Sequence, residues 1–471
     1  MEQIHERVAG LDVHRDSVSA CARVPGLRRE VVTHKARFAT TTAGLSALAD
    51  WLRDEAVTIV AMEATGVYWK PCFYALEDRF EVRLCNAYHV KNVPGRKTDT
   101  SDAAWLADVI AHGMVRASFV PPVPIRELRD LTRYRKRQTD IRAAEVQRLE
   151  KVLQDAGIKL TSVASGVLTM SGCHMIDALI AGERNPAVLA EKAIGRMRTK
   201  LPALTEALSG HFGPHHAVTA RQILDHVDFL DSRIAVVSEQ VTQRMVPFTA
   251  AVELLVAIPG ISQHSAEVVI AETGGDMSRL PSPAHLASWA GVAPGNHESA
   301  GKRRRVGTTN GNRWLRRTLI ESARAAARTK TSYLGAQYRQ IAARRGPNKA
   351  AVAVAHSLTD VIWHLLTTGE IFQDLGADYY QQRRDPERET QRLVRKLEGL
   401  GHSVTLTSAV DQPTRNASSR GFAPTLWSRT PTISVTQTHF TAEGVGRRDP
   451  GVPQQRPGMA TGGDARESRG S

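Results

Sequence analysis

The sequence predicts an α/β domain at the N-terminus, followed by a chain that is helical over most of its remaining length. Strand-like and helix-like patterns alternate over residues 58–113, which is typical of an α/β layer architecture. Two long helical patterns follow at 125–160 and 217–245. A basic helical region then begins at Ala251. These three observations predict an α/β domain, joined to a mainly helical second half.

The α/β prediction depends on short patterns taken in chain order. VSACARV within residues 7–24 alternates apolar and polar side chains, so that stretch predicts two strands joined by a tight turn, with a third at 30–38. Residues 42–54 predict a helix with one apolar face. TIVAMEAT is a continuous apolar run, as expected for a strand covered on both faces. YWKPCFYALEDR then predicts a helix, and EVRLCNA a strand.

The second half of the chain predicts helices of two kinds. Residues 125–160 and 217–245 carry apolar seams at three- and four-residue steps and are separated by a helical insert. This pattern favours an antiparallel coiled-coil arm, although a compact helical bundle fits the periodicity equally well. LLVAIPGISQHSAEVVIAETG (254–274) resembles a helix-hairpin-helix that binds the DNA backbone, or forms an ordinary αα-hairpin.

The expected domain organisation follows from these changes in pattern and composition. Ser, Thr, Pro, Arg and Gly dominate the end of the chain without a sustained period, which predicts disorder. We therefore expect an α/β domain at 5–120, a helical connector at 125–248, a helical domain at 250–380, an extension at 381–410 and a disordered tail at 411–471.

The charge and the cysteines restrict the class of protein. The 471 residues carry a formal net charge of +14, which indicates a polyanionic partner, most often nucleic acid. No run approaches the ~18 apolar residues of a membrane-spanning helix, and the N-terminus lacks the apolar core of a signal peptide. The four cysteines show no CxxC pairing and lie in apolar stretches. We therefore expect reduced thiols in a cytoplasmic protein, without a membrane partner and without a zinc site.

Four acidic residues stand where a carboxylate is unexpected. Asp12 interrupts the first strand in GLDVH, and Glu63 ends the apolar run IVAMEAT. A buried, unpaired charge costs several kcal/mol, so each needs a cation or a metal. Asp99 and Asp102 are three residues apart at the start of a predicted helix, where they would share one face. Four such oxygen ligands suit a pair of Mg²⁺ ions.

Each carboxylate also has a purely structural interpretation. Asp99 could cap its helix and pair with Arg96 or Lys97. Asp12 could be a turn residue, and Glu63 could form a salt bridge at the end of its strand. A single carboxylate of this kind is more often structural, but four in this order favour a metal site.

A serine in the second half lies among basic residues. Ser299 stands in a loop rich in Gly and Asn, and Arg313, Arg316 and Arg317 follow on a predicted helix. Directly after the loop serine come Lys302, Arg303, Arg304 and Arg305. A serine nucleophile needs activation, and developing phosphorane charge needs cationic donors. The alternative is a phosphate- or RNA-binding loop whose serine only forms hydrogen bonds.

These motifs together resemble a known family. GLDVH, IVAMEATGVYW and GRKTDTSDAAWLAD look like the N-terminal domain of the DEDD transposases of bacterial insertion sequences, the IS110 type related to pilin-gene DNA invertases. AGVAP, SAGKRR and GNRWLR resemble the C-terminal transposase domain of the same family. Many relatives have two glycines after the serine, where this chain has Ala300 and Gly301.

The resemblance implies a fold, a site and partners. It implies a RuvC-like (RNase H) fold for the N-terminal domain, with Asp12, Glu63, Asp99 and Asp102 binding Mg²⁺, and Ser299 as the nucleophile that joins covalently to DNA. It further implies DNA and an element-encoded guide RNA as partners, and a homo-oligomer in the synaptic complex. Nucleic-acid contacts are expected at Arg96 and Lys97 and in the basic cluster after Ser299.

The expected function is therefore that of a transposase or site-specific DNA recombinase in the bacterial cytoplasm, associated with the nucleoid. Two alternatives use the same residues differently. A junction-resolving nuclease would use only the carboxylates, with Ser299 as a binding residue. An inactive remnant of a mobile element would bind nucleic acid without cleaving it.

Overall fold

The computed structural model divides the chain into two compact units, residues 1–377 and 378–471. The second unit contains α16 (Tyr379–Gln382), α17 (Pro386–Glu398) and a hairpin of β8 (Ser403–Leu406) and β9 (Ile433–Thr436). The structure describes residues 3–26, 30–64, 66–94, 101–296, 298–299, 301–303, 307–308, 310–382, 386–406 and 433–436.

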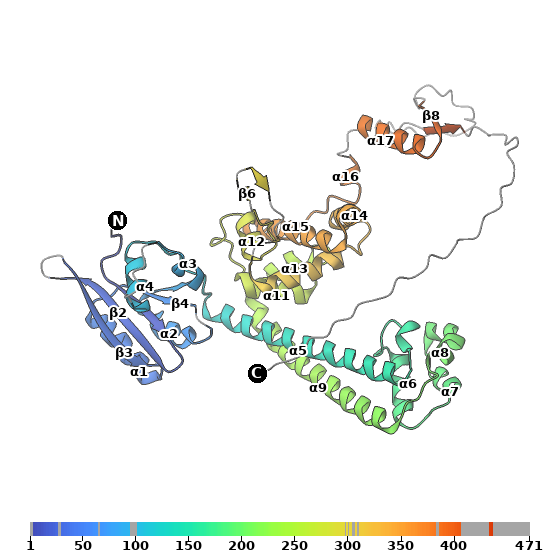
Figure 1. Ribbon diagram of the computed structural model, residues 1–471, viewed down its shortest axis with the longest axis horizontal. Helices are drawn as coiled ribbons and strands as arrows, with labels where there is room; N and C mark the ends of the chain where they lie inside the picture. Colours follow the sequence, from blue (N-terminus) through green and yellow to red (C-terminus); the bar gives the residue numbers. More distant parts are fainter. Residues whose placement is uncertain are drawn as a thin grey trace, which may run out of the picture. The chain divides into compact units, whose positions relative to one another are not determined.

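The N-terminal part of the first unit is built on a five-stranded mixed sheet (Figure 1). The strands lie in the order β3-β2-β1-β4-β5, in which β1, β2 and β3 are antiparallel and β1, β4 and β5 are parallel. Their bounds are β1 (Val8–Val13), β2 (Ser17–Pro25), β3 (Val31–Ala39), β4 (Ile59–Glu63) and β5 (Glu81–Cys85). The predicted α/β character of this region is confirmed.

Helices cover both faces of this sheet. On one face α1 (Thr42–Asp54) and α2 (Trp69–Leu76) pack on Leu11, Val60 and Met62. On the other face α4 (Asp102–Ala111) packs on Val8, Ile59 and Ala61. Short α3 (Ala87–Lys91) lies between β5 and α4 in the chain. The alternation of side chains along each strand therefore divides the core into two layers.

Two long helices form the middle of the first unit. α5 (Val123–Asp155) and α9 (Pro214–Met245) run alongside one another, as Figure 1 shows. At the far end of the pair α6 (Met170–Ile180), α7 (Pro186–Ala190) and α8 (Leu201–Ala207) enclose a separate core that includes Leu149, Leu204 and Val227. The two periodic stretches thus form a helix pair with a helical insert.

The remainder of the first unit is a helical domain around one core. Its helices are α10 (Thr249–Val256), α11 (Gln263–Thr273), α12 (Pro283–Trp289), α13 (Arg313–Ala326), α14 (Tyr333–Arg345) and α15 (Pro347–Thr368). Ile125 and Leu128 of α5 also belong to this core. α15 is long and apolar enough to cross a membrane, but its Val354, Leu358 and Ile362 are buried in the helical core. Burial within the protein explains its composition.

The four cysteines are free thiols, as expected, and three of them are buried. Burial raises the pKa of Cys72 to about 12. Burial is also the main reason why the pKa of Cys85 rises to about 11, and Glu63 adds to it. These thiols are protonated at neutral pH, which suits residues of an apolar core.

Candidate active site

Two carboxylates lie at the ends of neighbouring parallel strands. Leu11 of β1 is paired with Met62 of β4, so the residues that follow them, Asp12 and Glu63, also lie side by side. Strands in a sheet are about 4.8 Å apart. Leu11 and Met62 face α1 and α2, and alternation therefore places Asp12 and Glu63 on the opposite face, which α4 covers.

That face admits α4 only because β1 contains a glycine. A Cβ atom on Gly10 would lie 2.1 Å from the carbonyl oxygen of Ala103 and 2.5 Å from the amide nitrogen of Ala107. The backbone of the first turns of α4 is thus in direct contact with β1. Glycine at this position, in the motif GLDVH, allows the close approach.

The direction of α4 brings its first residue toward the same point. Asp108 near its end forms an ion pair of 3.6 Å with Arg23, which is paired with Val8 at the start of β1. The last residue, Ala111, accepts a hydrogen bond of 2.8 Å from the amide of Ile4. α4 therefore runs antiparallel to β1, and Asp102 lies at the end of the sheet where β1 reaches Asp12.

The charges around these carboxylates have distinct roles. Asp12, whose side chain is 30% exposed, lies 3.1 Å from Nε2 of His14. Asp108 also approaches His112 at 3.6 Å, in addition to its pair with Arg23, so it stabilises the packing of α4 rather than the cluster. Asp99, Arg96 and Lys97 lie outside the described residues. α4 begins at Asp102, with Ser101 as its N-cap.

Ser299 lies at the tip of a small hairpin in the helical domain. β6 (Glu298–Ser299) pairs with β7 (Lys302–Arg303), and Ser299 is opposite Lys302. Gly301 has a φ of +73°, a backbone conformation that glycine adopts without steric cost. An isolated bridge between Pro294 and Thr308 closes the base of this hairpin. The serine therefore occupies the last position before the turn.

A buried polar network holds the chain where it leaves the hairpin. Asn312 caps α13 by accepting from the amides of Trp314 and Leu315 at 3.0 and 3.1 Å. Its Nδ2 donates to Glu272 of α11 at 2.7 Å. Glu272 is fully buried and also accepts two hydrogen bonds of 2.7 Å from Arg133 of α5. One carboxylate thus joins α5, α11 and the start of α13.

The predicted nucleic-acid contacts after Ser299 have different environments. Arg313 is exposed and stacks on Trp314 at 4.9 Å. Arg317 forms two hydrogen bonds of 2.7 Å with Asp140 of α5, whereas Arg316 lines a groove at the base of the hairpin. Lys302 and Arg303 belong to β7, and Arg304 and Arg305 lie outside the described residues. Arg317 is thus held by a carboxylate within the protein.

The arginines of α5 are largely occupied within the protein. Arg126 forms a bidentate pair with Glu77 of α2 at 2.7 and 3.0 Å. Arg135, 1% exposed, pairs with buried Glu267 at 2.7 Å. Burial is the main reason why the pKa of Arg129 falls to about 10, although Glu272 raises it. These arginine side chains therefore join the helices to one another.

The helix–turn–helix at 254–274 forms as expected from α10 and α11. A Cβ atom on Gly260 in its turn would lie 2.4 Å from the carbonyl oxygen of Ser322 in α13. The N-terminus of α11 is capped by Ser262, which accepts from the amide of Ser265. These contacts favour the αα-hairpin of the two alternatives, because the turn is packed against α13. A role in DNA binding stays a prediction.

Among the described residues, Asp155, His215 and His216 have ligand atoms within 4.8 Å of one another. Nδ1 of His216 accepts from the amide of Gly213 at 3.0 Å, and its Nε2 lies 3.0 Å from Asp155. A neutral ring that accepts at Nδ1 carries its proton at Nε2. That proton occupies the atom that would bind a metal. The cluster therefore serves to join the end of α5 to the start of α9 by a hydrogen bond.

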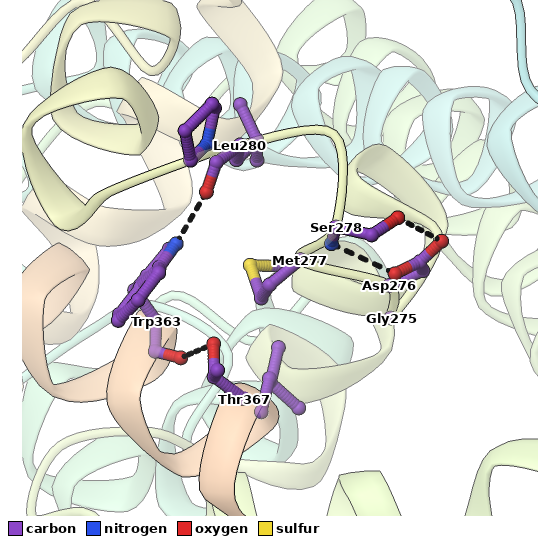
Figure 2. A pocket seen from close by; sticks show the side chains of 9 residues that line it. Gly275, Asp276, Met277, Ser278, Leu280, Trp363 and Thr367 are labelled. Atoms are coloured by element: carbon purple, nitrogen blue, oxygen red, sulfur yellow. Dashed lines mark hydrogen bonds between the residues drawn. The ribbon is translucent and has the colours of Figure 1, made fainter.

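A cavity of about 640 Å³ in the helical domain has few free polar groups (Figure 2). The indole of Trp363 donates to the carbonyl of Leu280 at 2.6 Å. The carboxylate of Asp276 accepts from the amide and the hydroxyl of Ser278, both at 2.8 Å. Because these groups satisfy one another, the cavity is not a candidate for the chemistry.

Sequence reasoning missed residues in both parts of the site. His14 lies beside Asp12, and its signal was its position two residues after Asp12, just past the end of β1. Arg345 and Lys349 line a groove near the hairpin base. Their signal was the segment RRGPNK, in which basic residues surround the Gly-Pro start of a helix.

Comparison with known proteins gives the family. A DEDD transposase family model of the IS110 type, described as "Transposase", matches residues 9–158, and the model of the "Transposase IS116/IS110/IS902 family" matches residues 252–339. The transposase for insertion sequence element IS1111A of Coxiella burnetii is 26% identical over 383 residues, which cover 78% of this chain and 91% of the relative. The putative transposase y4pF/y4sB of Sinorhizobium fredii is 25% identical, over 67% of this chain and 74% of the relative. The two matched regions contain the carboxylates and the serine hairpin respectively, and the chain belongs to the IS110 family of DNA transposases.

Proposed function

We propose that this transposase cleaves and joins DNA strands with the carboxylates of its α/β domain and the serine of its helical domain. The observation that carries the proposal is the convergence of Asp12, Glu63 and Asp102 at one end of the α4 face. The strand order, with three antiparallel strands followed by two parallel ones and helices on both faces, supports a RuvC-like (RNase H) fold for this domain.

The donor set of the carboxylate cluster suits a hard divalent cation such as Mg²⁺, which prefers oxygen ligands. Asp12, Glu63 and Asp102 would hold it, with Asp99 as the fourth ligand. A bound cation there would stabilise charge on the oxygens of a phosphate undergoing displacement. His14, hydrogen-bonded to Asp12, orients that carboxylate. Arg96 and Lys97 would hold the DNA backbone as it enters the site.

Ser299 would provide the nucleophile. Its hydroxyl oxygen attacks a DNA phosphorus, the bond from phosphorus to the leaving deoxyribose oxygen breaks, and the serine proton ends on that oxygen. The product is a phosphoserine link that conserves the energy of the phosphodiester bond for rejoining. The position of Ser299 directly before the turn of a short hairpin supports this role, because a hairpin tip can reach a partner surface.

RNA is the second proposed nucleic-acid partner. A net charge of +14 favours binding of polyanions, and an element-encoded RNA would pair with donor and target DNA. Strand exchange between two DNA molecules requires several subunits, so the active complex is proposed to be a homo-oligomer. Both proposals extend the family resemblance to this chain.

The test is an in vitro reaction of the full chain with Mg²⁺, circular-junction DNA of the element and the RNA flanking it. We expect an adduct of protein and DNA that survives denaturing electrophoresis. Ser299→Ala should abolish the adduct and recombination, and Asp12→Asn should abolish cleavage. Ser209→Ala and Asp78→Asn, at exposed positions away from the cluster and the hairpin, are the matched controls.

The outcomes separate the three candidate functions. Normal recombination by Ser299→Ala would refute the serine as nucleophile. Cleavage without an adduct, lost only in Asp12→Asn, would favour the nuclease that uses the carboxylates alone. A wild-type chain that binds both nucleic acids but leaves the DNA intact would indicate an inactive remnant.

A further inference from the structure

A groove of about 980 Å³ lies at the base of the serine hairpin. One wall is the hairpin base, and the other is formed by α13, α14 and α15. The hairpin contributes Pro294, Gly307 and Thr308. The helices contribute Arg316, Gln337, Arg345, Asn348, Lys349, Val352, Ala353, His356 and Ser357. Segments from three parts of the sequence thus meet directly beside the hairpin that carries Ser299.

The groove is positively charged. Arg316, Arg345 and Lys349 line it, and none of their side chains has a hydrogen bond or an ion pair among the described residues. No aspartate or glutamate is among the described lining residues. Arg317, next to Arg316 in the chain, is instead bonded to Asp140. Unpaired cations in a concave surface concentrate the positive potential and attract polyanions.

The N-terminus of α15 adds further hydrogen-bond donors to the groove. This 22-residue helix begins at Pro347; its N-cap is Gly346, whose φ is +84°, and no side chain caps it. The first-turn amides of Asn348 and Lys349 therefore remain available, and the helix dipole places partial positive charge there. Amides at a helix N-terminus are well suited to bind phosphate.

An unsatisfied side chain in the wall gives independent evidence for a ligand. Nε2 of Gln337 in α14 donates to the hydroxyl of Ser357 at 2.9 Å. Its Oε1 is buried and has no hydrogen-bond partner among the described residues. Buried polar atoms are almost always satisfied by protein, water or ligand. An unsatisfied acceptor in the wall of a groove lined by unpaired cations fits a ligand with both phosphates and hydrogen-bond donors, which is the chemistry of a nucleotide chain.

We propose that this groove binds the backbone of the DNA strand that reaches Ser299, an inference that rests on the proposed role of that serine. Ser299 is five residues from Pro294, so the chain between them spans at most about 17 Å. That length corresponds to about five nucleotides along one strand. A strand held by Arg316, Arg345 and Lys349 thus has a phosphate within reach of the hairpin tip.

The test compares two double variants of the full chain that remove equal charge. Arg345→Gln/Lys349→Gln removes two cations from the groove. Arg344→Gln/Lys330→Gln removes two exposed cations that do not line it. Both are made together with Ser299→Ala, so that binding is measured without reaction. The probe is a fluorescent duplex of the element end, titrated at several salt concentrations.

The groove variant should bind this DNA about tenfold more weakly, and the slope of log K against log salt should fall by about two. The control should stay close to the Ser299→Ala parent. Equal effects of the two variants, or no change in slope, would overturn the proposal. Weakened binding of the flanking RNA with unchanged binding of DNA would overturn it too, because the groove would then hold RNA.

Failure of the proposed function would appear in a different measurement. Adduct formation is assayed with the chain that retains Ser299. If no adduct forms while the groove variant still loses affinity for DNA, the serine assignment fails and the groove assignment stands. If adducts form and the groove variant binds DNA as the control does, the groove assignment alone is refuted.

Discussion

Replacement of Glu272 by alanine should destabilise the contact between α5 and the helical domain. The carboxylate accepts three hydrogen bonds of 2.7 Å, two from Arg133 and one from Asn312. It is fully buried, and Arg129 and Arg133 beside it are only 13% and 33% exposed. Glu272→Ala leaves both guanidinium groups without this carboxylate. Loss of one partner from a buried ion pair costs about 3–5 kcal/mol.

Hydrogen exchange measured by mass spectrometry can localise this effect. The expected loss corresponds to opening of α11 and α13 that is about 100- to 4000-fold more frequent. Peptides from β1 and β4 serve as internal references, because their exchange should not change. Glu272→Gln should give a smaller loss, because the amide oxygen still accepts one hydrogen bond.

The matched control is Glu253→Ala on α10. Glu253 is exposed and has no ion pair among the described residues, so its replacement should change stability by about 0.5 kcal/mol or less. If α13 is protected from hydrogen exchange in Glu272→Ala as well as it is in Glu253→Ala, the network does not stabilise this contact and the reasoning is wrong.

Three further predictions concern other parts of the fold. Gly10→Ala should displace α4, abolish cleavage and lower the free energy of unfolding by about 1–3 kcal/mol. Gly166→Ala, where a Cβ meets no atom within 4 Å, should leave the stability unchanged, and urea unfolding measures the stability of both variants. Arg135→Ala should lower the free energy of unfolding by about 3–5 kcal/mol, because Glu267 would then be buried without a partner. The double variant Arg135→Met/Glu267→Leu should unfold at nearly the wild-type urea concentration, and an equal loss of stability in the single and the double variant would refute this. Because burial raises the pKa of Cys72 to about 12, this thiol should react with Ellman's reagent at pH 8 only after unfolding, and rapid native reaction would contradict its burial.

Local patterns predicted the elements of the α/β domain because each strand there has a repeating environment. VSACARV alternates because Val18, Ala20 and Ala22 face the core beneath α1 and α2 while Ser19 and Arg23 on the other face are only partly buried. IVAME is continuous because β4 is covered on both faces. The position of Asp12 and Glu63 at strand ends also followed from these runs. The direction of α4 did not, because it depends on the contact of Gly10 with Ala103. A contact between residues so far apart leaves no periodic signal.

Charge patterns were harder to interpret than apolar ones. An arginine on a long helix has the same sequence appearance whether it faces DNA or a carboxylate. Arg133 pairs with Glu272, which lies 139 residues later in the chain, and Arg135 pairs with Glu267, which lies 132 residues later. The groove at the hairpin base likewise combines residues from three separate segments. Only the tertiary structure distinguishes paired arginines from the unpaired Arg316 and Arg345.

These paired arginines connect α5 to both parts of the proposed active site. Arg126 holds α5 to Glu77 in the α/β domain, which carries the carboxylates. Arg133 holds the same helix to Glu272, whose carboxylate also binds Asn312 at the base of the serine hairpin. A shift of α5 along α11 would therefore break the bonds of Arg133 and release the hydrogen bond that orients Asn312. The hairpin that carries Ser299 is consequently coupled to the position of α5, so that movement of this helix would change how the serine is presented.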